Sequence, residues 1–553
     1  MRPDRMLPTG MRQTEKIISS MSFMRMKPRH WVLLIVFSTI MVRLAVYQGY
    51  TGSDAANYVE EAHNILTSGY SVAERLAVIP FEELSPSPLF NYQNLRLGFI
   101  LPNALSMGIF GINEFALSIF PFLCSIILIV SVYTLGREIY SPQAGVVAAL
   151  FAAFVPQDIN LTSTILPHIP TSAFMALSAC LFVMALKAQG IKKPVFLMVL
   201  SGFAACYAYT IWEFGLFILP VLALFLLIVF RWWRALFSRQ FWVLGLAFMT
   251  GFSLIFGAET LYFHYLSGEW LLRPRLISRM GKMILDVHPI DAGNIDFLRY
   301  PVAIVKSYYF GMFFYFAFAG AVVWICLRFC SGSDLAKQKI QALPVVWLFF
   351  LFLYLQWGSS SFGEYTPTFK LVTYLTVLTA PGALLSAHLI QQLYKWCSIQ
   401  KAPLLQYFSL PITAALVAAY AFTSIGCAVV NHIGNGPFQR DQTKHFAMSA
   451  LLKQYPPKTI YTDGWTARLL NFAFVYEREI AVFDKLDPYD RRLMAGLKEI
   501  KEGYVLINKG YIDYATRAYN NKSYPLFVYQ IPSAWEQLEI VGSFALYAVN
   551  DER

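Results

Sequence analysis

The sequence predicts a polytopic α-helical membrane protein that ends in a soluble α/β domain. The chain has 553 residues, of which 57% are hydrophobic and 14% are charged. A soluble protein carries about a quarter charged residues, and the mean hydropathy here is +0.50. Long apolar runs recur through the first 430 or so residues, and the composition becomes polar afterwards. These observations exclude a soluble enzyme, a disordered protein and a coiled coil.

The N-terminal segment predicts the orientation of the chain. Residues 1–30 are basic, and an apolar run over 31–48 follows. This run is longer than the core of a cleaved signal peptide and has no clear small-residue cleavage site. We therefore expect a cytoplasmic N-terminus followed by an uncleaved first span.

Ten further apolar runs follow the first one. They cover residues 115–136, 143–156, 168–186, 194–212, 214–231, 241–263, 302–328, 343–357, 369–394 and 404–430. The sequence therefore predicts about 11 transmembrane helices, with an upper limit of about 13, because some runs are shorter than the usual length of a span.

The loops on the predicted inner side are all basic, as the positive-inside rule requires. Their cations are Arg137, Lys187, Lys192, Lys193, Arg231, Arg234, Arg239, Arg328, Lys337, Lys339, Lys395 and Lys401. An odd number of spans then places the C-terminus outside the cell membrane. We expect a transmembrane catalytic domain over residues 31–434, with large external loops at 49–112 and 264–301.

The tail over residues 435–553 has the pattern of a small extracytoplasmic α/β domain. Short β-rich runs (TIYTDG, EIAVFD, GYVLIN, LFVYQI and FALYAV) alternate with helical patterns such as ARLLNFAF and RRLMAGLKEI. Its charges nearly balance, and it shows no basic face for nucleic acid. The seven cysteines all lie in or beside apolar runs, so neither a disulfide framework nor a zinc site is predicted.

Two aspartates are the candidate catalytic residues. Asp54 opens the helical stretch DAANYVEEAHNIL just after the first span, and Asp158 lies in the short polar segment VPQDINLTSTILPHIP. Each has an ordinary alternative, since Asp54 would suit a helix N-cap and Asp158 would suit a solvated loop. Glu213, in a tight outer turn, and Glu259, in the outer half of a span, are further ionisable residues near the membrane.

The second external loop carries four cations within ten residues. They are Arg273, Arg275, Arg279 and Lys282, and Arg96 and Lys370 could join them on the outer side. One interpretation is a basic helix that touches anionic headgroups. The other is a binding site for a lipid phosphate, because arginine binds phosphate oxygens bidentately.

Together these residues suit transfer of a group from a lipid phosphate. A polyprenyl phosphate is a good leaving group, so the reaction needs one carboxylate to deprotonate the acceptor and fixed positive charge beside the departing phosphate. The sequence contains no GxxxxGK[ST], HExxH, GxSxG or GxGxxG motif, so nucleotide-driven, zincin and serine-hydrolase chemistry has no motif support.

Arg43, Asp54 and Tyr58 lie within RLAVYQGYTGSDAANYVEEAHNILTSGY, and a second run extends from residue 89 to residue 158. Both segments resemble the GT-C membrane glycosyltransferases, in the branch of the protein O-mannosyltransferases and the lipid A aminoarabinose transferase. Ala55 replaces the second acid of the usual pair, Asn57 replaces a common arginine, and Arg96-Leu97-Gly98 stands in place of a Lys-Pro-Pro-Leu run.

The resemblance implies a polyprenyl-phosphate sugar donor and an acceptor that is a lipid, a glycan or a protein. It implies that Asp54 is the base and that Asp158 lies near the sugar or the acceptor. Candidate substrate-binding residues are Tyr58, Glu82, Glu83, Arg96, Arg273, Arg275, Arg279, Lys282 and Lys370. A divalent metal is possible, with Glu82 or Glu83 as an additional oxygen ligand. The alternatives are a transporter or flippase of a lipid-linked glycan, and a ligase or polymerase that uses a lipid diphosphate.

Overall fold

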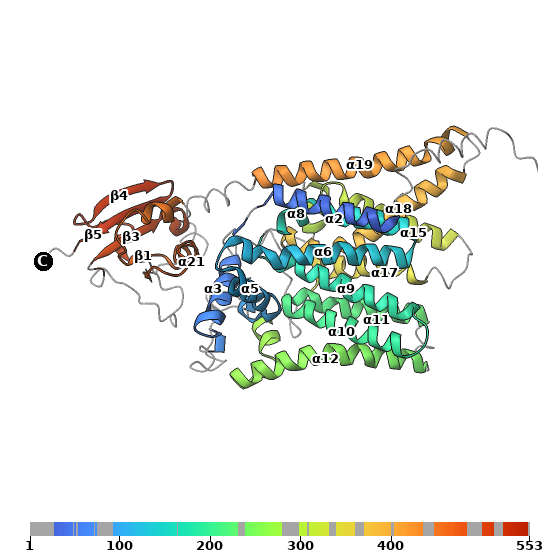
Figure 1. Cartoon of the computed structure of the whole chain (residues 1–553), viewed down its shortest axis with the longest axis horizontal. Helices are drawn as coiled ribbons and strands as arrows, with labels where there is room; N and C mark the ends of the chain where they lie inside the picture. Colours follow the sequence, from blue (N-terminus) through green and yellow to red (C-terminus); the bar gives the residue numbers. More distant parts are fainter. Residues whose placement is uncertain are drawn as a thin grey trace, which may run out of the picture.

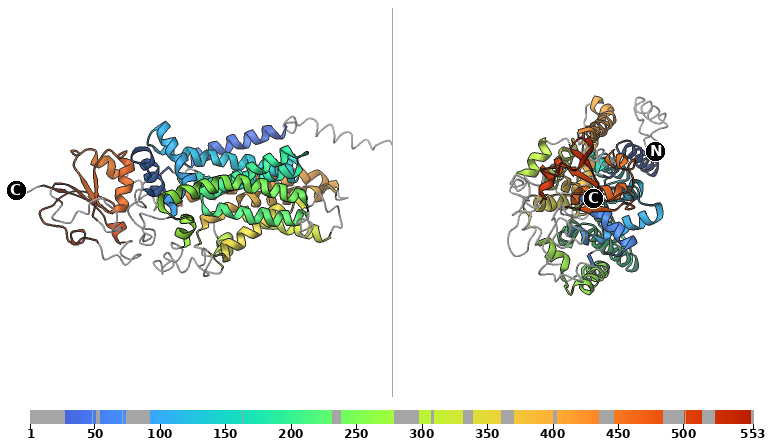
Figure 2. Two further views of the ribbon diagram at one scale, coloured as in Figure 1. Left: turned by 90° about the horizontal axis from the view of Figure 1, so that it is seen from below. Right: turned by 90° about the vertical axis from the view of Figure 1, so that its left-hand side faces the viewer.

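The computed structural model consists of a helical bundle with a small sheet domain at one end (Figure 1). It describes residues 27–47, 49–50, 54–70, 72–73, 92–162, 164–230, 238–278, 298–306, 309–330, 339–359, 370–399, 403–434, 447–483, 500, 502–513 and 524–550. Most of the long helices run nearly parallel to one another, and the short helix α3 (Asp54–Thr67) lies at the end of the bundle that faces the sheet domain. Figure 2 shows the same arrangement from two other directions.

Within the described residues, seven helical segments are long and apolar enough to cross a membrane, or eight if a bent pair counts as one span. The long segments are α2 (Pro28–Ala45), α6 (Glu114–Ile139), α9 (His168–Lys187), α10 (Lys192–Ile211), α12 (Arg239–Ser267), the stretch Val372–Ser398 formed by η6 (Val372–Leu378) and α18 (Thr379–Ile399), and α19 (Pro403–Gly434). The bent pair is α7 (Pro142–Ala153) and α8 (Pro156–Thr162), which meet at 63°. The chain is thus a multi-pass membrane protein.

Shorter apolar helices fill the rest of the bundle. They are α5 (Leu97–Phe110), α11 (Ile218–Phe230) after the turn η3 (Glu213–Phe217), α15 (Phe313–Cys330) and α17 (Leu343–Trp357), with the short α14 (Arg299–Lys306) before α15. Every apolar run that the sequence analysis identified overlaps a described helix, whereas α5 was not among those runs. The predicted number of about 11 spans goes beyond what length and apolarity establish for the described helices.

Local sequence sets where several helices begin. The side chains of Asn113, Ser141 and Ser238 accept hydrogen bonds from backbone N–H groups at 2.9, 3.1 and 3.3 Å, at the starts of α6, α7 and α12. These side chains satisfy donors that a helix leaves unpaired in its first turn. Proline is the first residue of α2, α7 and α8, where its missing N–H costs nothing.

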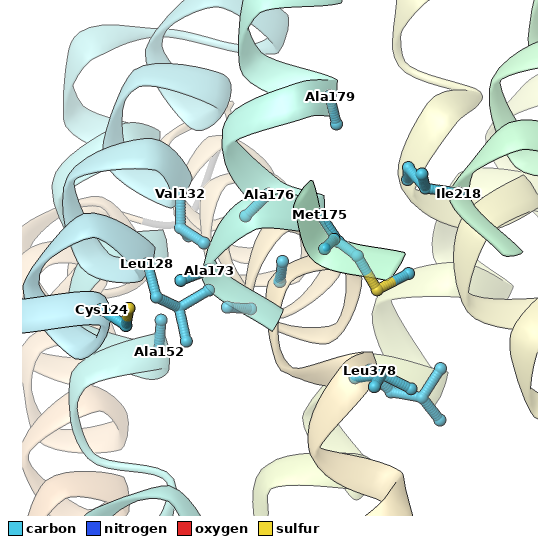
Figure 3. Packing of buried hydrophobic residues seen from close by; sticks show 14 of the residues in the cluster. Cys124, Leu128, Val132, Ala152, Ala173, Met175, Ala176, Ala179, Ile218 and Leu378 are labelled. Atoms are coloured by element: carbon cyan, nitrogen blue, oxygen red, sulfur yellow. The ribbon is translucent and has the colours of Figure 1, made fainter. Parts of the chain in front are cut away.

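The interior of the bundle is packed by small and aliphatic side chains. Figure 3 shows Cys124, Leu128 and Val132 of α6 beside Ala173 and Ala176 of α9. Helices α10 and α12 approach even more closely, because a Cβ atom on Gly202 would lie 1.9 Å from the Phe248 carbonyl oxygen. A Cβ atom on Gly251 would lie 1.9 Å from the Val199 carbonyl oxygen. Two glycines therefore permit backbone contact between these helices, as is common in membrane bundles.

The C-terminal domain contains a five-stranded mixed sheet in the order β2-β1-β3-β5-β4. Its strands are β1 (Ile460–Thr462), β2 (Ile480–Val482), β3 (Gly503–Asn508), β4 (Glu536–Val541) and β5 (Phe544–Val549), and α21 (Gly464–Ala473) follows β1. β2, β1 and β3 are parallel, whereas β3, β5 and β4 are antiparallel.

Four of the five predicted β-rich runs form strands, and one prediction was wrong. LFVYQI contains the 3₁₀ turn η7 (Leu526–Val528), in which Phe527 and Val528 are buried without strand pairing. The strand β4 comes instead from EQLEIV, an edge strand with mostly exposed side chains, so its sequence lacks the apolar alternation of a buried strand. The helix predicted within ARLLNFAF is present as α21. Most of RRLMAGLKEI lies outside the described residues.

Candidate functional site

Helix α3 carries the first candidate catalytic residue. The predicted surface helix begins at Asp54, whose side chain is half-buried. A carboxylate in the first turn of a helix is favoured by the helix dipole. Tyr58 lies one turn further on and is 1% exposed, with its ring 4.8 Å from the Phe99 ring in an edge-to-face arrangement. α3 therefore rests on α5 through its apolar side while Asp54 stays partly accessible.

Arg96 joins Tyr58 to the bundle. It immediately precedes α5, and its Nη1 donates a short hydrogen bond to the Tyr58 hydroxyl oxygen. Its Nη2 and Nε contact the Glu213 carboxylate at 2.7 and 3.2 Å. Burial raises the pKa of the Tyr58 phenol, so the hydroxyl keeps its own proton at neutral pH and remains a donor.

Arg273 completes a group of four buried charges with Arg96, Glu213 and Glu259, which we name the ion cluster. Its Nη2 lies 2.9 Å from Glu213 Oε1, and its Nη1 lies 2.8 Å from Glu259 Oε1. Burial by itself lowers the pKa of Arg273, but the Glu259 and Glu213 carboxylates raise it above the ordinary value. Two guanidinium groups and two carboxylates thus compensate each other.

The predicted phosphate-binding cations are only partly brought together. Arg96 and Arg273 share Glu213, whereas Arg275 is more than half exposed and pairs with Glu269. Lys370 is buried directly before η6. Arg279, Lys282, Glu82 and Glu83 lie outside the described residues.

Asp158 has a different environment from the one predicted. The sequence favoured a polar segment at the outer membrane face, or a solvated loop, but the structure places Asp158 in α8 with a fully buried side chain. The bend before Pro156 turns this short helix into the bundle, where it packs against α19 and α2. The alternative of a solvated loop carboxylate is therefore wrong, because the bent pair α7–α8 surrounds the residue with other helices.

Arg43 of α2 is the charged neighbour of Asp158. Its side chain is 1% exposed and interacts electrostatically with Asp158. Neither carboxylate oxygen of Asp158 and none of the three guanidinium nitrogens of Arg43 has a hydrogen bond of normal geometry to another described residue, although the Thr379 hydroxyl lies nearby. Buried polar atoms are rarely left in this state without a functional reason or a bound water molecule.

An aromatic group beside Arg96 was not identified from the sequence. The rings of His168 and Trp212 are 4.6 Å apart, those of Trp212 and Tyr374 are 5.0 Å apart, and Arg96 lies near enough to influence His168 electrostatically. Trp212 directly precedes Glu213 in the turn that the sequence singled out. The sequence shows that Trp212 lies beside Glu213, and this position was a usable signal. The sequence does not show that Trp212 contacts η6, which lies far along the chain.

No group of three or more His, Cys, Asp or Glu side chains within the described part of the chain is arranged to hold a metal ion. Asp54 and Asp158 lie on different elements with different neighbours, Tyr58 for the first and Arg43 for the second. Glu82 and Glu83, the additional ligands considered for a metal, are not among the described residues.

Comparisons with known proteins agree with this architecture. Residues 99–256 match the family model described as dolichyl-phosphate-mannose-protein mannosyltransferase. ArnT from Cupriavidus metallidurans bound to undecaprenyl phosphate has a similar structure, with a TM-score of 0.64 at 12% identity over 94% of this chain and 98% of that one. The chain therefore shares the fold of ArnT, and part of it matches this mannosyltransferase family.

A second structural neighbour is larger than this chain. The oligosaccharyltransferase of Archaeoglobus fulgidus in complex with zinc and sulfate has a TM-score of 0.53 at 13% identity, and the similarity covers 94% of this chain and 73% of that chain. No curated protein matches the sequence. The predicted resemblance is confirmed over the matched residues, and the family match and the shared fold agree with the predicted enzyme class, a glycosyltransferase with a polyprenyl-phosphate sugar donor. The family match includes Asp158, Glu213 and part of α12, but not Asp54, Arg96 or Arg273.

Proposed function

We propose that the enzyme transfers a sugar from its polyprenyl-phosphate donor to an extracytoplasmic acceptor, with Asp54 as the general base. The observation that carries this proposal is the position of Asp54. It is a half-buried carboxylate in the first turn of α3, at the end of the bundle that faces the C-terminal domain. An acceptor that is a lipid, a glycan or a protein must reach the base from outside the bundle, which buried Asp158 does not allow.

The proposed reaction is a single displacement. The acceptor oxygen forms a bond to the sugar's anomeric carbon, the bond from that carbon to the phosphate oxygen breaks, and Asp54 takes the acceptor proton. The products are the glycosylated acceptor and the polyprenyl phosphate. A positioned base of this kind contributes about 10²–10⁴-fold to a rate.

The phosphate is proposed to be held by cations outside the ion cluster. Glu213 and Glu259 already compensate Arg96 and Arg273. Arg275, whose pair with Glu269 is exposed, and the loop residues Arg279 and Lys282 are then the better candidates for the departing phosphate, together with Lys370. Arg96 and Arg273 are proposed to fix Tyr58 and the turn η3. The remaining predicted residues, Glu82 and Glu83, are proposed to contact the substrate from the first external loop.

Asp158 is proposed to act through Arg43 and not by contact with the acceptor. The pair connects the first span to the bent helices α7–α8, and the unsatisfied atoms of both side chains are available to polar groups of the bound substrate or to water. Buried ionisable residues in membrane segments commonly mark such functional positions.

The orientation is proposed from charge. Glu138, at the end of α6 away from the C-terminal domain, contacts Lys187 at 2.9 Å and Arg137 at 2.8 Å. The positive-inside rule would place this end, and the N-terminus, in the cytoplasm, and α3 with the C-terminal domain outside. We retain about 11 spans as part of this proposal, since a short apolar helix can cross where the bilayer thins locally or where flanking polar side chains extend to the interface.

The test is a transfer assay in liposomes with a panel of radiolabelled polyprenyl-phosphate sugars. We expect the wild type to release polyprenyl phosphate in the presence of an acceptor, and Asp54→Asn to lose at least about 100-fold in rate while inserting and folding normally. Glu502→Gln, which removes a carboxylate paired with Lys458 on the C-terminal domain, is the control and should keep the wild-type rate. Transfer by Asp54→Asn at the wild-type rate would rule out Asp54 as the base, and lipid movement between leaflets without turnover would support the transporter alternative.

A further inference from the structure

We propose that Arg468 of the C-terminal domain is a positioning residue, which holds α3 and thereby sets the position of Asp54. The proposal rests on the proposed role of Asp54. It assigns to the C-terminal domain an indirect contribution to the reaction, made through one side chain of α21 that contacts the middle of α3.

Arg468 contacts two residues of α3 at once. Its Nε lies 3.1 Å from Glu60 Oε2, and its Nη1 donates a short hydrogen bond to Asn57 Oδ1, a residue 411 positions away in the sequence. The Arg468 side chain is about 5% exposed. A buried charge in contact with two partners has few alternative positions, so it fixes the helix that it contacts.

Asn57 connects Arg468 to the membrane domain. While Oδ1 accepts from Arg468, Nδ2 donates to Gln93 Oε1 at 2.9 Å. Gln93 belongs to the short 3₁₀ helix η2 (Tyr92–Leu95), which immediately precedes Arg96. One amide therefore connects the C-terminal domain, α3 and the segment that leads to the ion cluster. Asn57 is three residues after Asp54, so a shift of this turn would move the catalytic carboxylate as well.

Two aromatic contacts flank the polar one. The Tyr50 ring lies 4.5 Å from the Phe472 ring, just before α3. The His63 ring, on the third turn of α3, stacks on the Tyr476 ring at 3.6 Å with an interplanar angle of 7°. The contact between the domains thus extends along α3 from its start to its later turns.

The backbone conformation after α21 supports a specific contact between the C-terminal domain and α3. Val475 and Tyr476 have φ values of 55° and 60°, a left-handed conformation that non-glycine residues seldom adopt. Val475 is β-branched, for which this conformation is especially costly, and such strain persists only where surrounding contacts maintain it. A hydrogen bond of 2.7 Å from Tyr476 N to Asn471 O closes this turn. The turn places the Tyr476 ring against the His63 ring.

The test compares Arg468→Gln with Arg478→Gln in the full-length enzyme. Arg478 lies in the same domain, but its guanidinium binds the carbonyl oxygens of Leu452, Pro456 and Lys458 and none of the described atoms of α3. The measured quantities are kcat and KM for the polyprenyl-phosphate sugar, and the hydrogen exchange of α3 amides in the absence of substrate.

For Arg468→Gln we expect kcat to fall about 10- to 100-fold, the range that a small misplacement of a catalytic group produces, with an unchanged KM for the donor and faster exchange in α3. Asn57→Ala should give the same loss, and the double variant should add little to it, because both residues belong to one connection. Arg478→Gln should leave kcat and the exchange of α3 unchanged.

Two results would overturn the proposal. One is wild-type kcat and wild-type exchange in Arg468→Gln, and the other is an equal loss of kcat in Arg478→Gln, which would indicate a general effect of disturbing the domain. Failure of the proposed function looks different, because then Asp54→Asn retains activity while Arg468→Gln still accelerates exchange in α3. In that case the domain holds α3 without positioning the base, and the catalytic role of Arg468 is rejected.

Discussion

Two groups of charged side chains are buried in the helical part of the protein, and they are satisfied in different ways. In the ion cluster, Arg96 and Arg273 contact Glu213 and Glu259 at 2.7–2.9 Å. In the second group, Arg43 and Asp158 interact electrostatically, but their polar atoms have no hydrogen bonds of normal geometry to other described residues. Both groups contain equal numbers of positive and negative charges.

The difference indicates what each group does. Removing a charge from water costs several kcal/mol, and close pairing with additional hydrogen bonds is needed to offset it. The ion cluster meets this condition and fixes three separate elements around Tyr58 and η3. The Arg43–Asp158 pair does not meet this condition, so we expect it to contribute little to stability. The following predictions test this contrast.

Breaking the ion cluster should have the largest effect on stability. Glu213→Gln leaves two buried guanidinium groups with too little negative charge, and we expect the free energy of unfolding to fall by about 3–5 kcal/mol, as when one partner of a buried pair is removed. The measurement is reversible unfolding in detergent micelles. Glu269→Gln, which breaks only the exposed pair with Arg275, should cost less than about 1 kcal/mol. Equal losses of unfolding free energy in the two variants would show that burial of the ion cluster contributes nothing to stability.

The Arg43–Asp158 pair should respond in the opposite way. Replacing both residues, as in Arg43→Met with Asp158→Leu, should change the free energy of unfolding by no more than about 1 kcal/mol or should increase it, because an apolar pair avoids the desolvation cost. The rate of sugar transfer should nevertheless fall by at least about 10-fold if the pair serves the reaction. Unfolding and transfer are measured on the same preparation.

The single variants extend this comparison. Asp158→Asn alone should destabilise the protein less than Glu213→Gln, since no direct hydrogen bond between described residues is lost. If the double variant Arg43→Met with Asp158→Leu kept full activity and lost stability, the Arg43–Asp158 pair would be structural. That result would contradict the difference drawn here between this pair and the ion cluster.

A third buried carboxylate gives an intermediate case outside the membrane. Asp463 accepts a hydrogen bond from Thr466 N at 2.8 Å at the start of α21, whereas its Oδ2 has no partner among the described residues. Burial raises the pKa of Asp463 to about 6. Since the pKa in the folded state lies above the unfolded value of about 3.9, this group stabilises the fold most below pH 4. Its contribution is lost as the pH rises through about 6.

The pH dependence can be measured with Asp463→Asn. The amide keeps a cap oxygen but does not titrate, so the variant should gain stability relative to the wild type between pH 5 and pH 7.5, by about 1–2 kcal/mol. Unfolding of the full-length protein is followed by calorimetry at both pH values. A difference that is constant with pH would show that Asp463 does not titrate in this range.

Much of the helical architecture was predictable because it depends on local properties. The apolar runs correspond to described helices, α3 begins at Asp54 as the sequence indicated, and four of the β-rich runs form strands. The errors have local causes as well. β4 is an edge strand with exposed side chains, and LFVYQI buries two apolar residues in a turn.

The candidate site was less predictable, and the reasons are particular. Asp158 was expected near water because its segment is polar, but the 63° bend before α8 buries it beside Arg43. Arg273 was expected to be available for phosphate, but Glu213 and Glu259 contact it. In both cases the partner lies on another helix, and no local pattern identifies it.

The sequence by itself determined the membrane-spanning class, the C-terminal α/β domain and a carboxylate at the start of a surface helix. These follow from the length of apolar runs, the periodicity of side chains and the residues that begin helices. The tertiary structure alone decided which charges are compensated. Arg96 pairs with Glu213 across 117 positions, and Arg468 contacts Asn57 across 411. The energy of such a contact depends on distance and burial, which only the packed chain defines.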